Sequence, residues 1–287
     1  MFEDNPDLLK FGSILSSPGK KIAMLAPSFI VDFDYPKIIG DLKGIGFDLV
    51  TEITTGAAIV NNLYKEYLAE NPDQPLISSA CPSVVSLLKS RYPDLRHYLA
   101  PFVSPMGAMS RLLHKLYPDY TLVFIGPCFA KKAEAKLYHP EIAVVLTYKE
   151  LHDYLSQRPT GPMVGVNAEF DSFFNDETKI YPLPGGMTDT ACLKMALGDD
   201  KIVIDEGVAN TMNIFQNFTD ITKTKQFFDL LNCTGGCLGG PGIETSVPFE
   251  QRKQNLIAFM QTTKKKHADK KKVTQSFPSD IDYTRSF

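Results

Sequence analysis

Short apolar segments alternate with amphipathic segments through the first two thirds of the chain, and this alternation limits the fold more than any other feature. The predicted strands run over residues 21–26, 47–53, 75–78, 120–125 and 143–147. The predicted helices run over residues 35–44, 57–70, 83–91 and 147–155, the last with Thr147 as its N-cap. Strands that alternate with helices favour an α/β fold, in which a mostly parallel sheet has helices on its faces.

The length of 287 residues fits one large domain built from two lobes. A second α/β unit begins near residue 141 and includes a predicted strand over residues 201–204. Hydrophobic residues make up 44% of the chain and charged residues 22%, which is enough apolar material for a sizeable core. We therefore predict two lobes, approximately 1–140 and 141–287, whose mostly parallel, helix-flanked sheets enclose a site.

The charge pattern excludes some classes of partner. A formal net charge of -3 provides no broad basic field, so neither a nucleic acid nor an anionic membrane is an expected partner. No segment approaches the ~20 apolar residues of a membrane span. The N-terminus is acidic and lacks the pattern of a secretory signal, so we expect a cytoplasmic protein. The basic run over residues 264–272 predicts a solvated helix face, with a docking patch for an acidic electron carrier as the alternative.

Four of the five cysteines indicate a cluster site. Cys81 follows the predicted strand 75–78, and Cys128 follows the predicted strand 120–125. Ligands gather outside the carboxyl ends of parallel strands, so the two thiols can face one crevice. Cys233 and Cys237 lie in a segment with five glycines in ten residues, which can turn sharply and pass close to a bulky inorganic group. Four thiolates are the usual ligands of an iron–sulfur cubane.

Other uses of these cysteines fit the sequence less well. The C-x-x-x-C spacing of Cys233 and Cys237 differs from the C-x-x-C pairs of structural zinc sites. A disulfide-stapled secreted domain would be smaller and richer in cysteine. Cys192 lies within a helical pattern without Gly or Pro beside it, and we expect it to be a thiol of the core.

Three motifs in order resemble those of the cluster-bearing domain of iron–iron hydrogenases. Residues 78–82, Ser-Ser-Ala-Cys-Pro, resemble the family's Thr-Ser-Cys-Cys-Pro. Residues 126–134, Gly-Pro-Cys-Phe-Ala-Lys-Lys-Ala-Glu, resemble Met-Pro-Cys-x-x-Lys-x-x-Glu. Residues 231–240, Leu-Asn-Cys-Thr-Gly-Gly-Cys-Leu-Gly-Gly, resemble Met-x-Cys-x-x-Gly-Cys-x-x-Gly-Gly. Weaker similarity extends over nearly the whole chain.

The resemblance implies a specific cofactor, the H-cluster. In this family a [4Fe-4S] cubane is bridged through one cysteine to a two-iron unit with carbonyl, cyanide and azadithiolate ligands. By position, Cys81, Cys128 and Cys233 would bind the cubane, and Cys237 would also bridge to the two-iron unit. Lys131 would donate to a cyanide ligand in a charge-assisted pair.

Further site residues follow from the same resemblance. Ser104 and the backbone at Ala26, Pro27 and Ser28 would hydrogen-bond the other diatomic ligands. Tyr181 falls where the family has an aromatic residue near the site, although a core tyrosine is an equally good interpretation.

The sequence also departs from the family at the proton relay. The relay cysteine of the first motif is replaced by Ala80, whose methyl group cannot transfer a proton. The relay's acidic residues fall at Asn62 and Lys65, and its serine falls at Ala100. These losses resemble the divergent members of the family, which are minimal or sensory.

The expected function is reversible interconversion of dihydrogen with protons and electrons, slow because Ala80 breaks the usual relay. Glu134 is one candidate for a new proton route, and ordered water beside Ala80 is another. No ferredoxin-like domain is expected, so electrons would come from an external carrier such as ferredoxin, and maturation proteins would insert the two-iron unit. The alternatives are a hydrogen-sensing protein and an iron–sulfur scaffold that lacks the two-iron unit.

Overall fold

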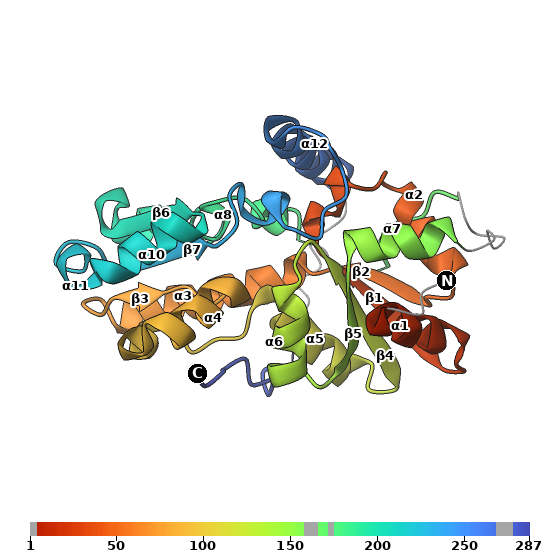
Figure 1. Ribbon diagram of the computed structural model, residues 1–287, viewed down its shortest axis with the longest axis horizontal. Coiled ribbons are helices and arrows are strands. Elements are labelled where there is room, and N and C mark those ends of the chain that lie inside the picture. The colour runs from red at the N-terminus through yellow and green to blue at the C-terminus, as the bar shows by residue number, and fades with distance from the viewer. Residues whose placement is uncertain (1–4, 158–165, 172–174, 268–277) are drawn as a thin grey trace.

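Two parallel sheets lie at opposite ends of the long axis of the molecule (Figure 1). The computed structural model describes residues 5–157, 166–171, 175–267 and 278–287. The first sheet has the order β2-β1-β4-β5, from strands β1 (Lys20–Leu25), β2 (Leu49–Glu52), β4 (Tyr120–Gly126) and β5 (Ile142–Thr147). The second has the order β3-β7-β6, from β3 (Leu76–Ile77), β6 (Ile202–Glu206) and β7 (Phe227–Leu231). Every strand pair is parallel, which confirms the predicted fold class.

Helices cover both faces of the first sheet because the residues of its central strand alternate in direction. Ala23 and Leu25 of β1 belong to the core on one side of the sheet. Helices α1 (Pro6–Ser16), α2 (Lys37–Gly44) and α7 (Tyr148–Ser156) contribute to that core. Ile22 and Met24 pack on the other side, against Met109 and its neighbours on α5 (Pro105–Leu116). Thr147 caps α7 through a capping box with Glu150, as the sequence predicted.

The second sheet is covered in the same way. Tyr64 of α3 (Thr54–Glu70) packs on one face, against Phe227. The other face packs against three helices, α4 (Pro82–Arg91), α10 (Val208–Gln216) and α11 (Phe218–Ile221). Strand β7 was not predicted from the sequence, and Asp229 interrupts its apolar run. Asp229 is buried and accepts hydrogen bonds from the backbone N–H and the hydroxyl of Thr188.

The sheets do not divide at residue 140, where the lobes were predicted to meet. β5 follows that point and pairs with β4 in the first sheet, whereas β3 precedes it and pairs with β7 in the second. The chain therefore crosses between the sheets more than once, and the two-lobe boundary remains a prediction.

Cys192 is exposed, so its predicted place in the core is wrong. The helical pattern around it is broken, because α8 (Gly186–Thr190) ends before it and α9 (Leu193–Leu197) begins after it. Cys192 adopts a left-handed φ of 54° at this junction, and its side chain turns to solvent.

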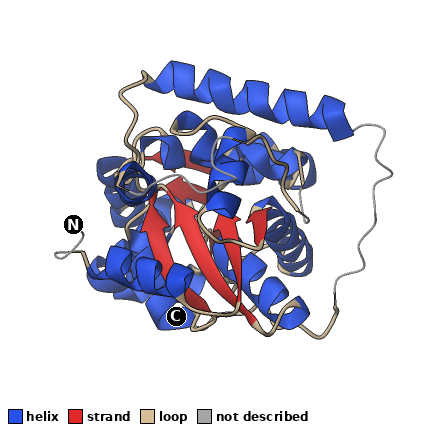
Figure 2. Ribbon diagram, turned by 90° about the vertical axis from the view of Figure 1, so that its right-hand side faces the viewer, coloured by secondary structure: helices blue, strands red, loops and turns tan. Residues whose placement is uncertain are grey.

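The long helix α12 (Phe249–His267) lies across the molecule (Figure 2). Its Leu256 and Phe259 are buried against the first sheet's core. Lys264 and Lys266 at its end form ion pairs with Glu177 and Glu169. The predicted solvated helix face thus includes anchored lysines, and residues 268–272 of the basic run lie outside the described residues.

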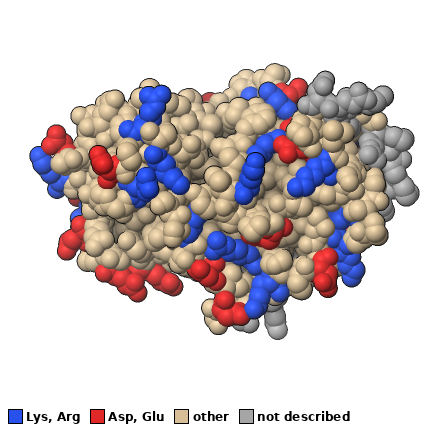
Figure 3. Space-filling view, turned by 60° about the horizontal axis from the view of Figure 1, so that its bottom comes forward, with Lys and Arg blue, Asp and Glu red and all other residues tan. Residues whose placement is uncertain are grey.

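The surface in Figure 3 has acidic and basic side chains interspersed, without a broad field of one sign on that face. Among the described residues, no helix combines the length and the apolar character that crossing a membrane requires.

Three shorter helical elements follow strands β1, β4 and β7. They are η1 (Pro27–Val31) after β1, α6 (Ala130–Tyr138) after β4, and η5 (Gly236–Gly239) after β7. Each of them begins next to the pocket described in the next section.

Candidate cluster site

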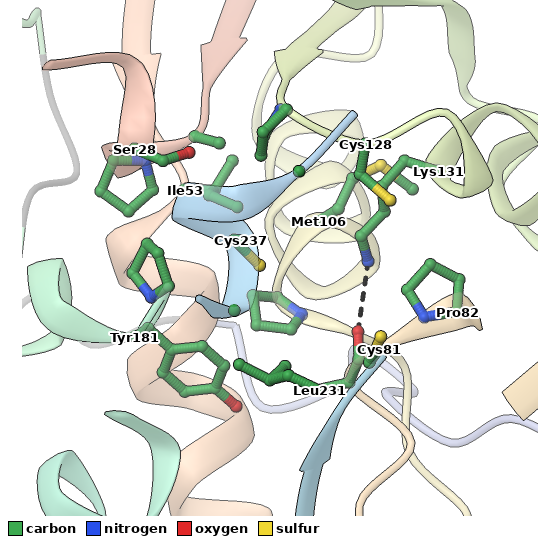
Figure 4. A pocket seen from close by; sticks show the side chains of 18 of the residues that line it. Ser28, Ile53, Cys81, Pro82, Met106, Cys128, Lys131, Tyr181, Leu231 and Cys237 are labelled. Carbon is green, nitrogen blue, oxygen red and sulfur yellow. Dashed lines mark hydrogen bonds between the residues drawn. The ribbon is translucent and has the colours of Figure 1, made fainter. Parts of the chain in front are cut away.

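A pocket lies where the carboxyl ends of the two sheets meet, and all four predicted cysteine ligands line it. Figure 4 labels Cys81, Cys128 and Cys237 among its lining residues. Cys128 follows β4 of the first sheet, whereas Cys81 follows β3 of the second. Cys233 and Cys237 follow β7 of the second sheet. The site therefore lies between two sheets, and not at the edge of one.

Two of the cysteines lie at the starts of helices. Cys81 directly precedes α4, and Cys128 lies two residues before α6. Burial and the neighbouring Cys81 thiol raise the pKa of Cys128. The backbone N–H groups of Ala130 and Lys131 act in the opposite direction, because they donate toward the sulfur and favour the thiolate.

Glycines give the Cys233–Cys237 loop its shape. Gly235 and Gly236 have left-handed φ angles of 80° and 60°, which favour glycine. A Cβ atom on Gly236 would lie 2.6 Å from the carbonyl oxygen of Pro182. The Cys237 N–H donates to that same oxygen at 2.8 Å. The glycines thus let the loop close against neighbouring backbone and turn Cys237 to the pocket.

The arrangement of the thiols fits a multi-atom cluster better than one metal ion. Within the part of the chain that the structure describes, no three His, Cys, Asp or Glu side chains converge closely enough to hold a single ion. The pocket encloses about 860 Å³, including its open mouth, which far exceeds the room that one ion needs. Burial raises the pKa of Cys233 to about 11, and burial likewise raises that of Cys237. A positively charged group such as iron ions would favour the thiolate forms of Cys233 and Cys237.

Among the described residues that line the pocket, Lys131 is the one with an ammonium group. Its Nζ donates to Glu134 Oε2 at 2.6 Å, to Ser104 Oγ at 2.8 Å and to the Ala80 carbonyl oxygen at 3.4 Å. Figure 4 shows this side chain extending from the Cys128 side toward Cys81. The lining is otherwise mostly apolar, so the ammonium is the group best suited to attract an anionic ligand there.

Glu134 lies behind Lys131 and does not line the pocket. It is buried, and its Oε1 accepts a hydrogen bond of 2.9 Å from Arg285 Nη1. Burial alone would raise the pKa of Glu134, but Lys131, His139 and Arg285 together hold it well below its usual range. Glu134 is therefore a carboxylate between cations, one step removed from the pocket.

The other predicted site residues occupy varied positions. Ala26, Pro27 and Ser28 line the pocket, and the Ser28 hydroxyl is bonded to the Tyr148 hydroxyl at 2.7 Å. Ser104 does not line the pocket. Its hydroxyl accepts a hydrogen bond from Lys131 Nζ and caps α5 by accepting from the Gly107 N–H. Tyr181 lines the pocket, and its buried hydroxyl has no hydrogen-bond partner among the described residues.

The core behind Ala80 is mostly apolar. Ala80 lines the pocket and packs against a core cluster that contains Val60 and Ala100. Asn62 and Lys65, where the family's relay acids were expected, are exposed on α3. These positions supply no acidic group between Ala80 and solvent.

Several site residues were missed by the sequence analysis. Thr54 and Asn232 line the pocket directly after β2 and β7, so the rule that ligands gather at strand ends could have found them. Arg285 had no such signal. It comes from the C-terminal segment, which returns under α6, and its Nη2 donates to the Ser79 carbonyl oxygen at 2.9 Å.

Two curated proteins illustrate the relatives of this chain. The "Cytosolic Fe-S cluster assembly factor NAR1" of Encephalitozoon cuniculi is 26% identical over 206 residues, 65% of this chain and 56% of that protein. "Iron hydrogenase 1" of Clostridium pasteurianum is 22% identical over 257 residues, 72% of this chain and 45% of that protein. The chain thus spans about half the length of the curated relatives it matches.

Solved structures share the fold. The apo [FeFe]-hydrogenase HydA1 of Chlamydomonas reinhardtii, solved as a variant, has a TM-score of 0.66 at 17% identity. The structure described as showing stepwise [FeFe]-hydrogenase H-cluster assembly has a TM-score of 0.65 at 18% identity. Each match covers 87% of this chain and 88% of the other.

The family comparison covers most of the chain. The model for "Iron only hydrogenase large subunit, C-terminal domain" matches residues 19–241. That range contains both sheets and all four cysteines of the pocket. The chain therefore belongs to the family of the iron-only hydrogenase large subunit, C-terminal domain.

Proposed function

We propose that the chain binds an H-cluster in this pocket and interconverts dihydrogen with protons and electrons at a low rate. Cys81, Cys128 and Cys233 would hold the [4Fe-4S] cubane, and Cys237 would also bridge to the two-iron unit. The observation that supports this best is the Lys131 ammonium beside four thiols in an otherwise mostly apolar pocket. An anionic unit next to the cubane would gain a charge-assisted hydrogen bond from Lys131.

The roles of the protein's own residues follow from their positions. When bound, the cofactor would supply the bond chemistry of dihydrogen through its iron ions and their ligands. The thiols hold that group in place, and the apolar lining around Met106 and Phe124 limits water at it. Glu134 and Ser104 fix the direction of the Lys131 ammonium. Ala80 has no group that exchanges protons, and for that reason we expect slow turnover.

The remaining proposals concern the partners. An external electron carrier such as ferredoxin would exchange electrons directly with the cubane. Maturation proteins would deliver the two-iron unit, since its carbonyl, cyanide and azadithiolate ligands are not protein groups. A hydrogen-sensing role would use the same cofactor at low turnover, and the loss of the relay cysteine at Ala80 is compatible with it.

The similarity to the NAR1 assembly factor favours a second candidate, a protein of iron–sulfur cluster assembly. In that case the four cysteines would hold a cubane without the two-iron unit. Lys131 would then neutralise part of the negative charge of the cubane and its thiolates.

One experiment separates these functions. The purified protein is reconstituted with iron and sulfide and then incubated with a synthetic two-iron precursor. We expect infrared bands from carbonyl and cyanide ligands, together with slow hydrogen evolution from a reduced viologen. A Lys131→Gln variant should take up the cubane equally well but retain less of the two-iron unit. If the wild type shows only cubane signals in electron paramagnetic resonance, the hydrogenase proposal is wrong and the assembly role gains support.

A further inference from the structure

His139 lies between two carboxylates on the side of Lys131 away from the pocket. Its Nε2 is 3.7 Å from Glu134 Oε1, and its Nδ1 is 3.5 Å from Glu141 Oε1. The side chain is fully buried, and neither ring nitrogen forms a hydrogen bond with the described residues. A buried imidazole with one carboxylate facing each nitrogen can accept a proton on one side and release a proton on the other.

The backbone around His139 holds the ring in this position. His139 ends α6, and its N–H donates to the Ala135 carbonyl oxygen at 2.9 Å. The ring packs against Gly107 of α5, where a Cβ atom would lie only 2.2 Å from His139 Cε1. Gly107 therefore provides the space that the imidazole occupies, and any side chain there would displace the ring.

Glu141 connects this position to solvent. Its side chain is 10% exposed, whereas those of His139 and Glu134 are 0% and 1% exposed. Its Oε1 also accepts a 2.6 Å hydrogen bond from Ser110 Oγ, which orients the carboxylate. Glu141 is thus the most exposed of the three, and His139 connects it to the buried Glu134, which is bonded to Lys131 at the pocket lining.

We propose that His139 relays protons between Glu141 and Glu134, so that protons reach the pocket from the Lys131 side. In the inward direction Glu141 passes a proton to Nδ1 and the ring releases the proton on Nε2 to Glu134, which re-protonates Lys131 after its ammonium has given a proton to the pocket. Exchange with water, which takes the proton from Nδ1 and returns one to Nε2, then restores the starting tautomer. The proposal rests on the proposed hydrogen turnover, because that reaction consumes or releases protons in the pocket.

The charges around Glu134 suit a relay that does not store protons. Burial favours its protonated form, but Lys131, His139 and Arg285 outweigh burial and hold the pKa of Glu134 well below its usual range. Glu134 therefore holds a proton only as a minor, transient state. The charged groups that face the relay are Glu134 and Lys131 from α6, Glu141 before β5, and Arg285 from the C-terminal segment.

The first test needs no cofactor. In protein labelled with ¹⁵N-histidine, the signals of the two His139 ring nitrogens are followed by nuclear magnetic resonance in the wild type, Glu134→Gln and Glu141→Gln. Glu134→Gln should shift the Nε2 signal and Glu141→Gln the Nδ1 signal, because one carboxylate faces each nitrogen. Signals that are unchanged in both variants would overturn the relay.

The second test uses the protein loaded with cubane and two-iron unit. His139→Gln should lower hydrogen turnover by about 100-fold, the range of general acid–base catalysis, while the cubane signals remain unchanged. His114→Gln, at an exposed histidine of α5, is the matched control and should have wild-type turnover. Imidazole should restore part of the activity of His139→Ala, and this rescue also tests the role if His139→Gln folds poorly.

The outcomes separate the two proposals. Wild-type turnover in His139→Gln, or no rescue of a folded His139→Ala, would overturn the relay and leave the proposed function intact. Absence of turnover in the loaded wild type would overturn the proposed function. The ring-nitrogen signals would then still decide whether His139 contacts both carboxylates.

Discussion

The structure behind Ala80 and the structure behind Lys131 differ sharply, although the two residues touch at the same pocket. Ala80 packs against apolar residues such as Val60 and Ala100. Lys131 is followed by Glu134, His139 and Glu141, which form a chain of ionisable side chains. The family's usual relay would run on the Ala80 side, yet the groups able to exchange protons lie on the Lys131 side.

The residues that would hold a cofactor are therefore different from the residues that would supply it with protons. The four thiols come from strand ends of both sheets, positions that a parallel α/β fold naturally brings together. The ionisable groups come instead from α6, the start of β5 and the C-terminal segment. A chain can therefore keep the first set unchanged while the second set is rebuilt elsewhere around the pocket.

The largest effect should come from the thiols themselves. Cys128→Ala should abolish cubane uptake, because the remaining three thiols leave one iron without a protein ligand. The measurement is iron and sulfide content after reconstitution, together with the visible absorbance of the cluster. Cys192→Ala is the matched control, since Cys192 is exposed and lies outside the pocket lining, and it should bind the full complement. Full iron content in Cys128→Ala would contradict the ligand assignment.

The positions of the thiols were largely predictable from the sequence, whereas the contacts on the Lys131 side were not. The cysteines could be assigned because each follows a strand or lies in a glycine-rich loop, which are local patterns. Arg285 contacts Glu134 across 151 residues of sequence, and no local pattern reports such a contact. The wrong prediction for Cys192 has a similar cause, because a helical period says nothing of a single left-handed residue that ends one helix and starts another.

A smaller effect is expected at Arg285, which pairs with the Glu134 carboxylate behind Lys131. Arg285→Met removes a cation from the buried Glu134 carboxylate and should lower the free energy of unfolding at pH 7 by about 3 kcal/mol. The pKa of Glu134 is lower in the folded protein, so this carboxyl stabilises the fold above its unfolded pKa and less so as the pH falls. Arg285→Met raises the folded pKa, and acidification from pH 7 to pH 4 should then cost less stability than in the wild type.

Urea denaturation at both pH values measures this effect. Lys115→Met is the control, because its ion pair with Asp280 is exposed and should contribute nothing measurable. An Arg285→Met variant with wild-type stability would show that Lys131 alone compensates the charge of Glu134.

The smallest effect should come from Ala80→Cys, which restores the relay thiol of the family. A thiol at this position would face the pocket, but Val60 and Ala100 behind it offer no acid or base to continue the route. Asn62 and Lys65, exposed on α3, do not supply one either. We therefore expect Ala80→Cys to raise hydrogen turnover by less than about 10-fold, well below the full range of acid–base catalysis.

The measurement is hydrogen evolution by the loaded variant, alone and combined with His139→Gln. A gain that restores activity to His139→Gln would mean that protons pass on the Ala80 side after all, and the contrast between the two sides would fail.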